Sequence, residues 1–258
     1  MKVKINKEGK VKEFKLINKW EDVTIETYSK LMTFTNGTKS SEALETLTEL
    51  SNIPKELLNQ LELKHIVLML EKLSHLQSQE DTTLKNIIEI DGVRYGFHPD
   101  FDEMTLGEYA DIESFIKSGA DKHLPEIMAV LYRPIKEEVD GVYTIEPYNG
   151  DIRLRTEIMR KMSATQVHSA LFFFVSFRQR IFVNYAIIFD GSASGNEDAI
   201  ASESFADKWG WFGVMHRLTG SDISKLDAIT RLPLLECLTW LSYETDLNLQ
   251  NKVKLNSN

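Results

Sequence analysis

The chain has a single cysteine, Cys237, among its 258 residues. One thiol excludes an intramolecular disulfide framework and a metal site built on paired cysteines. Cys237 stands between Glu236 and Leu238 in a run of apolar residues with helical spacing, which predicts a small buried side chain. The first ten residues lack the apolar stretch of a signal peptide, so we expect synthesis in the cytosol.

Long hydrophobic runs without charge are also missing. The most apolar stretch, residues 170–189, carries Arg178 and Arg180 near its centre, where a membrane-spanning helix tolerates charge least. The sequence therefore predicts no membrane partner and, instead, a buried central helix. We expect its three consecutive phenylalanines, residues 172–174, to be wedged among neighbouring elements.

Positive charge is scarce overall. The formal net charge is -9 and the isoelectric point is near 5.3. This balance argues against a general nucleic-acid-binding protein, which needs a basic face for phosphates, and we expect no direct nucleic-acid partner. Residues 1–20 are the exception, because their seven lysines and two glutamates carry a net charge of +5. This arm is either a docking surface for an acidic partner, with Lys10, Lys12 and Lys15 as candidate residues, or a solvated hairpin edge guarded by lysines.

Catalytic and metal-binding signatures are absent from the sequence. It contains no phosphate-binding glycine loop, no His-Glu-x-x-His helix and no Cys-x-x-Cys pair. The six histidines share no ligand spacing. Residues 190–201 resemble a calcium loop only superficially, because Ala201 stands where the bidentate glutamate belongs. We therefore predict no catalytic residue, no cofactor and no metal ion.

What the sequence does contain is a nine-residue phrase that occurs twice. Residues 20–28 read WEDVTIETY and residues 101–109 read FDEMTLGEY. An aromatic residue, two acids, an apolar residue, Thr, a second apolar residue and a final Tyr match at an offset of 81, which also pairs Leu50 with Leu131. We refer to these segments as the first and second phrase. Their repetition predicts a duplicated structural unit, whereas an active site is usually built from unrepeated residues.

Each copy is predicted to begin with a β-hairpin, at residues 3–16 and 87–97. The dipeptide Asp91-Gly92 supplies the turn of the second hairpin, since both residues tolerate a positive φ. A further hairpin near residues 141–148 accounts for the greater length of the second copy.

Helices follow the hairpins. Thr105 and Glu108 have the spacing of a capping box, which predicts that a helix begins at the second phrase. A proline follows Arg133 and predicts the end of a later helix. The other predicted helices cover residues 41–50, residues 124–132, residues 63–73, and the segment from Met162 onward.

The sequence therefore predicts a mainly α protein with small β-hairpins, an α+β fold. A third, all-helical partial copy is indicated because Leu218 aligns with Leu50, and Leu234 with Ile66, at an offset of 168. The predicted organisation is a first copy at 1–83, a second copy at 84–190, a linker at 191–204, a C-terminal helical unit at 205–246, and a frayed polar tail at 247–258.

Aromatic residues gather near the C-terminus, and they have two interpretations. They are either part of the core of the third copy or an exposed patch that contacts another protein, since Trp and Tyr dominate binding hot spots. The candidate interaction residues are Trp209, Trp211, Phe212, Trp240 and Tyr243.

Several segments resemble proteins of tailed bacteriophages. Residues 208–243 look like the C-terminal part of virion and tail-assembly proteins, and residues 101–109, 129–135 and 145–148 are similar to the middle of the same proteins. The first phrase resembles the opening of tail assembly chaperones and baseplate-hub assembly proteins. The resemblance covers most of the chain, and its motifs are packing and capping patterns.

This resemblance implies a non-enzymatic morphogenesis protein in the cytoplasm of the infected host or in the virion. Its partners would be other phage structural proteins, such as tape-measure, tail, hub or neck proteins. One alternative within the class is a permanent head–tail connector or ring. An alternative of another class is a small cytosolic hydrolase that gathers His168, Glu157 and Asp190 in one pocket. A regulatory adaptor that binds a host protein through the lysine-rich hairpin is also considered.

Overall fold

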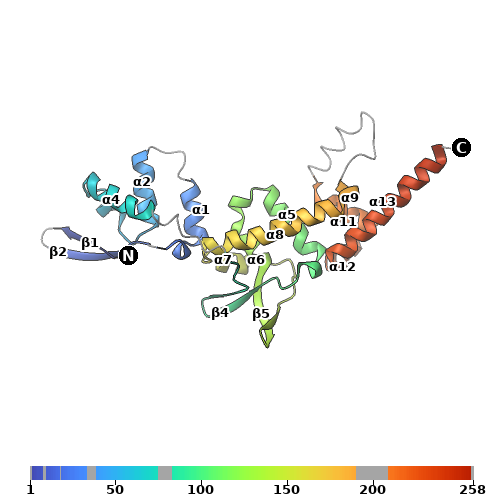
Figure 1. The fold of residues 1–258 in the computed structure, drawn as a ribbon, viewed down its shortest axis with the longest axis horizontal. Coiled ribbons are helices and arrows are strands. Elements are labelled where there is room, and N and C mark those ends of the chain that lie inside the picture. The colour runs from blue at the N-terminus through green and yellow to red at the C-terminus, as the bar shows by residue number, and fades with distance from the viewer. Residues whose placement is uncertain are drawn as a thin grey trace. The chain divides into compact units, whose positions relative to one another are not determined.

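The computed structural model describes residues 2–7, 10–17, 19–33, 39–74, 83–189 and 209–256. The chain divides into unit 1, residues 1–85 with 154–170, and unit 2, residues 86–153 with 171–258. The predicted fold class is confirmed: helices predominate (Figure 1), and the strands form one two-stranded and one four-stranded sheet. No helix among the described residues has both the length and the apolar character needed to cross a membrane.

Unit 1 combines the first hairpin with short helices. Leu16, Leu47 and Leu58 are fully buried in its core. The hairpin predicted at residues 3–16 and the helices predicted at 41–50 and 63–73 are confirmed to within about two residues. In chain order its elements are β1 (Lys2–Lys7), β2 (Lys10–Lys15), α1 (Ile25–Thr33), α2 (Lys39–Glu49), α3 (Lys55–Leu58), α4 (Leu63–Ser74), most of α7 (Arg153–Met159) and the first residues of α8 (Ala164–Asn184).

Unit 2 is built around the four-stranded antiparallel sheet, whose strand order is β3-β4-β5-β6. Its elements are β3 (Ile87–Ile90), β4 (Val93–Phe97), α5 (Leu106–Lys117), α6 (Leu124–Leu131), β5 (Tyr132–Val139), β6 (Val142–Ile145), the rest of α8, α9 (Ala186–Phe189), α11 (Trp211–Leu218), α12 (Leu226–Ile229) and α13 (Leu234–Asn256).

Local sequence chemistry explains the two hairpins of this sheet. Each turn pairs an aspartate with a glycine, and Asp91, Gly92, Asp140 and Gly141 all have a positive φ. The further hairpin is longer than predicted, because residues 132–139 form its first strand. That strand also pairs with β4, which joins the two hairpins into one sheet.

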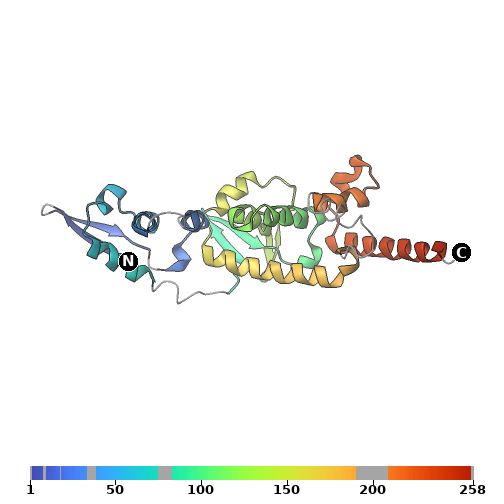
Figure 2. The same cartoon turned by 90° about the horizontal axis from the view of Figure 1, so that it is seen from above.

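The helix predicted within residues 170–189 exists, but only one of its faces is buried. Phe174 and Phe177 contact Tyr109 of α5, and Arg178 pairs with the buried carboxylate of Glu113 at 2.5 Å. The packing predicted for all three phenylalanines is wrong for Phe172, which is 71% exposed, and only partly right for the half-exposed Phe173. Figure 2 shows α8 running beside the strands and α5 of unit 2.

Both phrases adopt the same succession of elements. The 3-10 helix η1 (Trp20–Asp22) opens the first phrase, and η4 (Phe101–Glu103) opens the second. An extended segment centred on Thr24 or Thr105 follows, and then α1 or α5 begins at the next residue. The prediction that these segments are structural copies is confirmed.

Each phrase is held by a turn from a later part of the chain. Thr24 forms an antiparallel bridge with Ser163, and Thr105 forms one with Pro233. We call residues 160–163 and 230–233 docking turns. Each turn follows a short helix, α7 or α12, and each precedes a long one, α8 or α13.

The backbone hydrogen bonds repeat in detail. Ile25 N–H donates to the Met162 carbonyl at 2.8 Å, and Leu106 N–H donates to the Leu232 carbonyl at 2.9 Å. In the reverse direction, Ala164 N–H donates to the carbonyl of Val23 and Leu234 N–H to that of Met104, both at 2.8 Å. The first phrase therefore docks on the second copy, and the second phrase docks on the third.

This docking changes the organisation expected from the sequence. The boundary predicted between residues 83 and 84 lies close to the observed one, but residues 154–170 belong to unit 1 and residues 205–246 belong to unit 2. The predicted linker at 191–204 falls outside the described residues. The tail predicted at 247–258 is helical through residue 256, because α13 continues that far. Since α13 begins directly after its docking turn, as α4 begins at Leu63, the third copy aligns with the first at an offset of 171 rather than 168.

Candidate functional site

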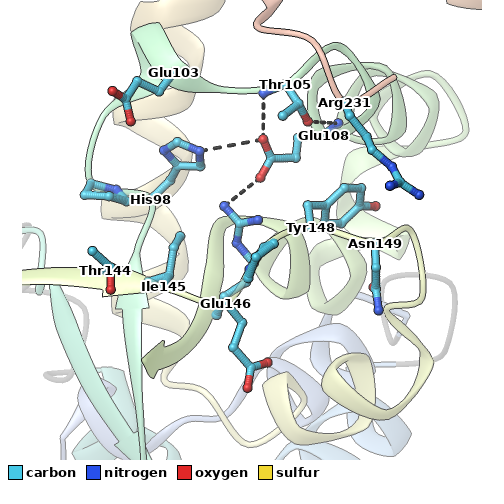
Figure 3. Close-up of a pocket in the computed structure, with 13 residues that line it drawn as sticks. His98, Glu103, Thr105, Glu108, Thr144, Ile145, Glu146, Tyr148, Asn149 and Arg231 are labelled. Atoms are coloured by element: carbon cyan, nitrogen blue, oxygen red, sulfur yellow. Dashed lines mark hydrogen bonds and ion pairs between the residues drawn. The ribbon is translucent and has the colours of Figure 1, made fainter. Parts of the chain in front are cut away.

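The most prominent polar site in unit 2 is a cavity of about 530 Å³ beside the second phrase. It lies where the end of β4, the start of α5, β5 and the segment after β6 meet, and Arg231 of the docking turn also lines it. Figure 3 shows the cavity, with the side chain of Glu108 between those of His98, Thr105 and Arg133.

Glu108 is the centre of this cluster, and its side chain is 2% exposed. Its Oε1 lies 2.6 Å from Nη2 of Arg133, and its Oε2 accepts a 2.6 Å hydrogen bond from the backbone N–H of Thr105. Nε2 of His98 lies 3.7 Å from the same Oε2. In return, the Glu108 backbone N–H donates to the Thr105 hydroxyl, which completes the capping box that the sequence predicts.

The electrostatics keep this carboxylate ionised. Burial by itself raises the pKa of Glu108, but the hydrogen bond to His98 and the charge of Arg133 outweigh burial, so the pKa lies below its ordinary value. A general base is most effective when its pKa lies near the working pH. The bound, acidic carboxylate of Glu108 therefore suits a structural anchor that fixes α5 to β5 and to the end of β4.

This anchor belongs to the second copy alone. The offset of 81 places Thr27 where Glu108 stands, and Thr27 contacts Thr24 through a 3.1 Å hydroxyl hydrogen bond. Sequence reasoning identified Glu108 as half of a capping box. It did not identify His98 and Arg133, since nothing in their local sequence marks them as its partners.

The five candidate aromatic residues divide between core and surface. Trp211 packs edge-on against Tyr109, with ring centroids 4.8 Å apart, and so belongs to the core of unit 2. Trp209 and Phe212, at the start of α11, are about half exposed and contact each other at 5.8 Å. Both interpretations of the aromatic cluster therefore apply, each to different residues.

Trp240 and Tyr243 form a second exposed aromatic pair, on α13. Their side chains are 59% and 61% exposed, and their ring centroids are 6.5 Å apart. A shallow hollow beside them is also lined by Leu235 and Thr239 of the same helix. The indole N–H of Trp240 donates to Glu244 at 3.0 Å, which holds the ring against the helix surface.

The candidate lysines lie along β2, with Lys10, Lys12 and Lys15 all exposed. β2 pairs with β1 and has no other strand beside it. Lysines on an exposed strand discourage pairing with another chain, so the geometry fits the guarded edge that the sequence analysis considers. Lys10 and Lys12 also border a hollow next to α3, together with Phe14 and Leu57.

The residues of the alternative hydrolase are not arranged as a catalytic group. His168 packs edge-on against Tyr28 at 5.6 Å, and Glu157 pairs with Arg160 on the surface. Asp190 lies outside the described residues. Within the part of the chain that the structure describes, no three His, Cys, Asp or Glu side chains are grouped so that they could hold a metal ion.

Comparisons with known proteins add no family to this geometry. No protein-family model, no curated protein and no solved structure matches the chain.

Proposed function

We propose that this chain is a non-enzymatic phage morphogenesis protein that acts through protein–protein contacts, as a tail assembly chaperone or as a hub or tail assembly component. The observation that carries the proposal is the exposure of two aromatic pairs on helices of unit 2, Trp209 with Phe212 and Trp240 with Tyr243. Large aromatic side chains supply much of the binding energy at protein interfaces.

Two further observations support this proposal. The anchor around Glu108 has the electrostatics of a structural ion pair rather than of a proton-transfer site. The resemblance of both phrases and of residues 208–243 to tail-assembly and virion proteins supplies the biological setting. The partners proposed are tape-measure, tail, hub or neck proteins, met in the cytoplasm of the infected host.

The test is site-specific crosslinking during infection. A photoreactive phenylalanine analogue at position 243 should capture a phage structural protein, identified by mass spectrometry. The same analogue at Gln250, an exposed polar position on the same helix, is the matched control. Capture of metabolic enzymes alone, or equal capture from both positions, would contradict the proposal.

A permanent head–tail connector or another structural virion protein is the alternative within this class. Purified mature particles distinguish the two roles, because a connector stays in the particle at fixed stoichiometry and a chaperone is absent from it. Quantitative mass spectrometry of such particles measures the difference directly.

A further inference from the structure

A third turn, at residues 59–62, has the same local structure as the two docking turns. It follows the short helix α3 and precedes the long helix α4, as residues 160–163 and 230–233 lie between a short and a long helix. In this alignment Leu63 corresponds to Ala164 and Leu234, which are the first residues of α8 and α13.

No described residue forms the docking hydrogen bonds with this third turn. At the other two turns a phrase bonds to the carbonyl two residues before the long helix and to the N–H of that helix's first residue. The equivalent groups here are the carbonyl of Leu61 and the N–H of Leu63. Neither has a partner of this kind within the described ranges.

Side-chain exposure shows the same difference. Ala164 is 2% exposed and Leu234 is fully buried, whereas Leu63 is 72% exposed. One helical turn later, Leu238 is fully buried and the corresponding Val67 is 43% exposed. Leaving apolar side chains of this size in water costs about 1.5–3 kcal/mol each relative to full burial, so this surface favours a covering partner.

The exposed residues border an apolar groove in unit 1. It has a volume of about 370 Å³ and lies between α2, α3 and α4. Its lining is almost entirely aliphatic: Ala43, Leu44, Leu58, Leu61, Leu63, Ile66, Val67 and Leu70 surround it, with Asn59 as the polar member.

We propose that this groove binds a partner protein through a segment of the same chemistry as the two phrases: an apolar residue, a threonine and a second apolar residue that lead directly into a helix. The residue after the threonine donates its N–H to the Leu61 carbonyl. The residue before it accepts from the Leu63 N–H. Its apolar side chains cover Leu63 and Val67.

The occupant is a different protein rather than a second copy of this chain. Val23, Ile25, Met104 and Leu106, the apolar residues on either side of the two threonines, are fully buried in their own docking turns. A second copy would have to undock one phrase to offer it, which empties one site to fill another. A partner with an undocked segment makes the contact without that loss.

The inference deepens the proposed function, because it specifies one contact surface, but its evidence is the internal repetition and its test requires no phage. A fluorescently labelled peptide of residues 99–118, which contains the second phrase, is titrated with the full chain and followed by anisotropy. We expect saturable binding. Replacing the residue that corresponds to Leu106 by aspartate in the peptide should weaken binding at least about tenfold, that is by about 1.4 kcal/mol.

Variants of the protein locate the binding site. Leu63→Glu should weaken peptide binding at least about tenfold, and the matched control Ile223→Glu, which alters a 78% exposed isoleucine in unit 2, should leave it unchanged. Because Leu63 is exposed, Leu63→Glu should also keep the melting temperature of the parent chain.

Three outcomes would overturn the inference. These are absence of binding at millimolar peptide, binding that survives Leu63→Glu because the peptide displaces a resident phrase, and a large fall in melting temperature for Leu63→Glu, which would mean that the chain covers its own groove. None of them bears on the crosslinking at position 243, so the two proposals fail separately.

Discussion

The carboxylate of Glu108 and the guanidinium of Arg133 lie 2.6 Å apart, with side chains only 2% and 5% exposed. This ion pair connects the first turn of α5 to β5, and it stands directly beside the docked second phrase. A charge that loses its counterion in such a place stays buried without compensation.

Removing the charge of Glu108 should therefore destabilise the protein strongly. We expect Glu108→Gln to lower the free energy of unfolding by about 3–5 kcal/mol, the usual cost of breaking a buried pair from one side. Denaturant titration measures the change. Glu103→Gln, at an exposed position in the same phrase, should stay within about 0.5 kcal/mol of the parent chain. Equal effects of the two substitutions would contradict the anchoring role.

The same pair should make stability depend on pH. The pKa of Glu108 is lower in the folded chain than in the unfolded one, so the unfolded state binds the proton first as pH falls. The stabilisation is present above the unfolded value of about 4.3 and is lost as pH falls through the folded pKa. The difference in unfolding free energy between parent and Glu108→Gln should therefore shrink as pH is lowered from 6 to 3, in chemical denaturation at about 0.5-unit steps. A difference that stays constant or grows would exclude this linkage.

The closeness of the second phrase to its docking turn should be sensitive to one methyl group. A Cβ on Gly107 would lie 2.9 Å from the Thr230 carbonyl oxygen, to which the Gly107 N–H already donates at 2.9 Å. We expect Gly107→Ala to cost about 1–3 kcal/mol by overpacking, more than the roughly 1 kcal/mol that alanine gains in a helix.

The first phrase provides the matched control for this substitution. Glu26 occupies the equivalent position and donates to the Arg160 carbonyl at a longer 3.1 Å. Glu26→Ala should change unfolding free energy by only about 0.5 kcal/mol, the value of its surface pair with Lys30. A stabilising Gly107→Ala would show that the turn moves aside freely.

The single thiol should report on unfolding. Cys237 is buried in α13, and burial together with the charge of Glu236 raises its pKa to about 11. At pH 8 we expect its reaction with a disulfide reagent to be at least about a hundredfold slower in the folded chain than in denaturant, because the thiolate is both scarce and enclosed. A Cys237→Ala, Gln250→Cys double variant should react at the rate of an exposed thiol. Fast labelling of native Cys237 would show that α13 opens easily.

Local chemistry made parts of this fold predictable. Asp91-Gly92 marks a hairpin because both residues accept a positive φ, and Thr105 with Glu108 marks a helix start because each satisfies the other's backbone donor. The shared phrase was recognisable for the same reason, since its aromatic residue, acids and threonine determine a 3-10 turn followed by a helix within a few residues.

Contacts between distant segments were not predictable in this way. Nothing near His98 or Arg133 in sequence indicates that they meet Glu108, and nothing near Trp211 distinguishes it from the exposed Trp209. The pairing of β4 with β5 likewise depends on which edges lie side by side after folding.

The amino-acid sequence alone determined where the repeated elements begin, because hairpin turns and helix caps are interactions between residues close together in the chain. Only the tertiary structure decided that each phrase docks on the copy that follows it and that the first turn is left uncovered. Those outcomes depend on backbone hydrogen bonds and apolar burial between residues far apart in the chain, and these interactions are decided by how well surfaces fit rather than by any local pattern.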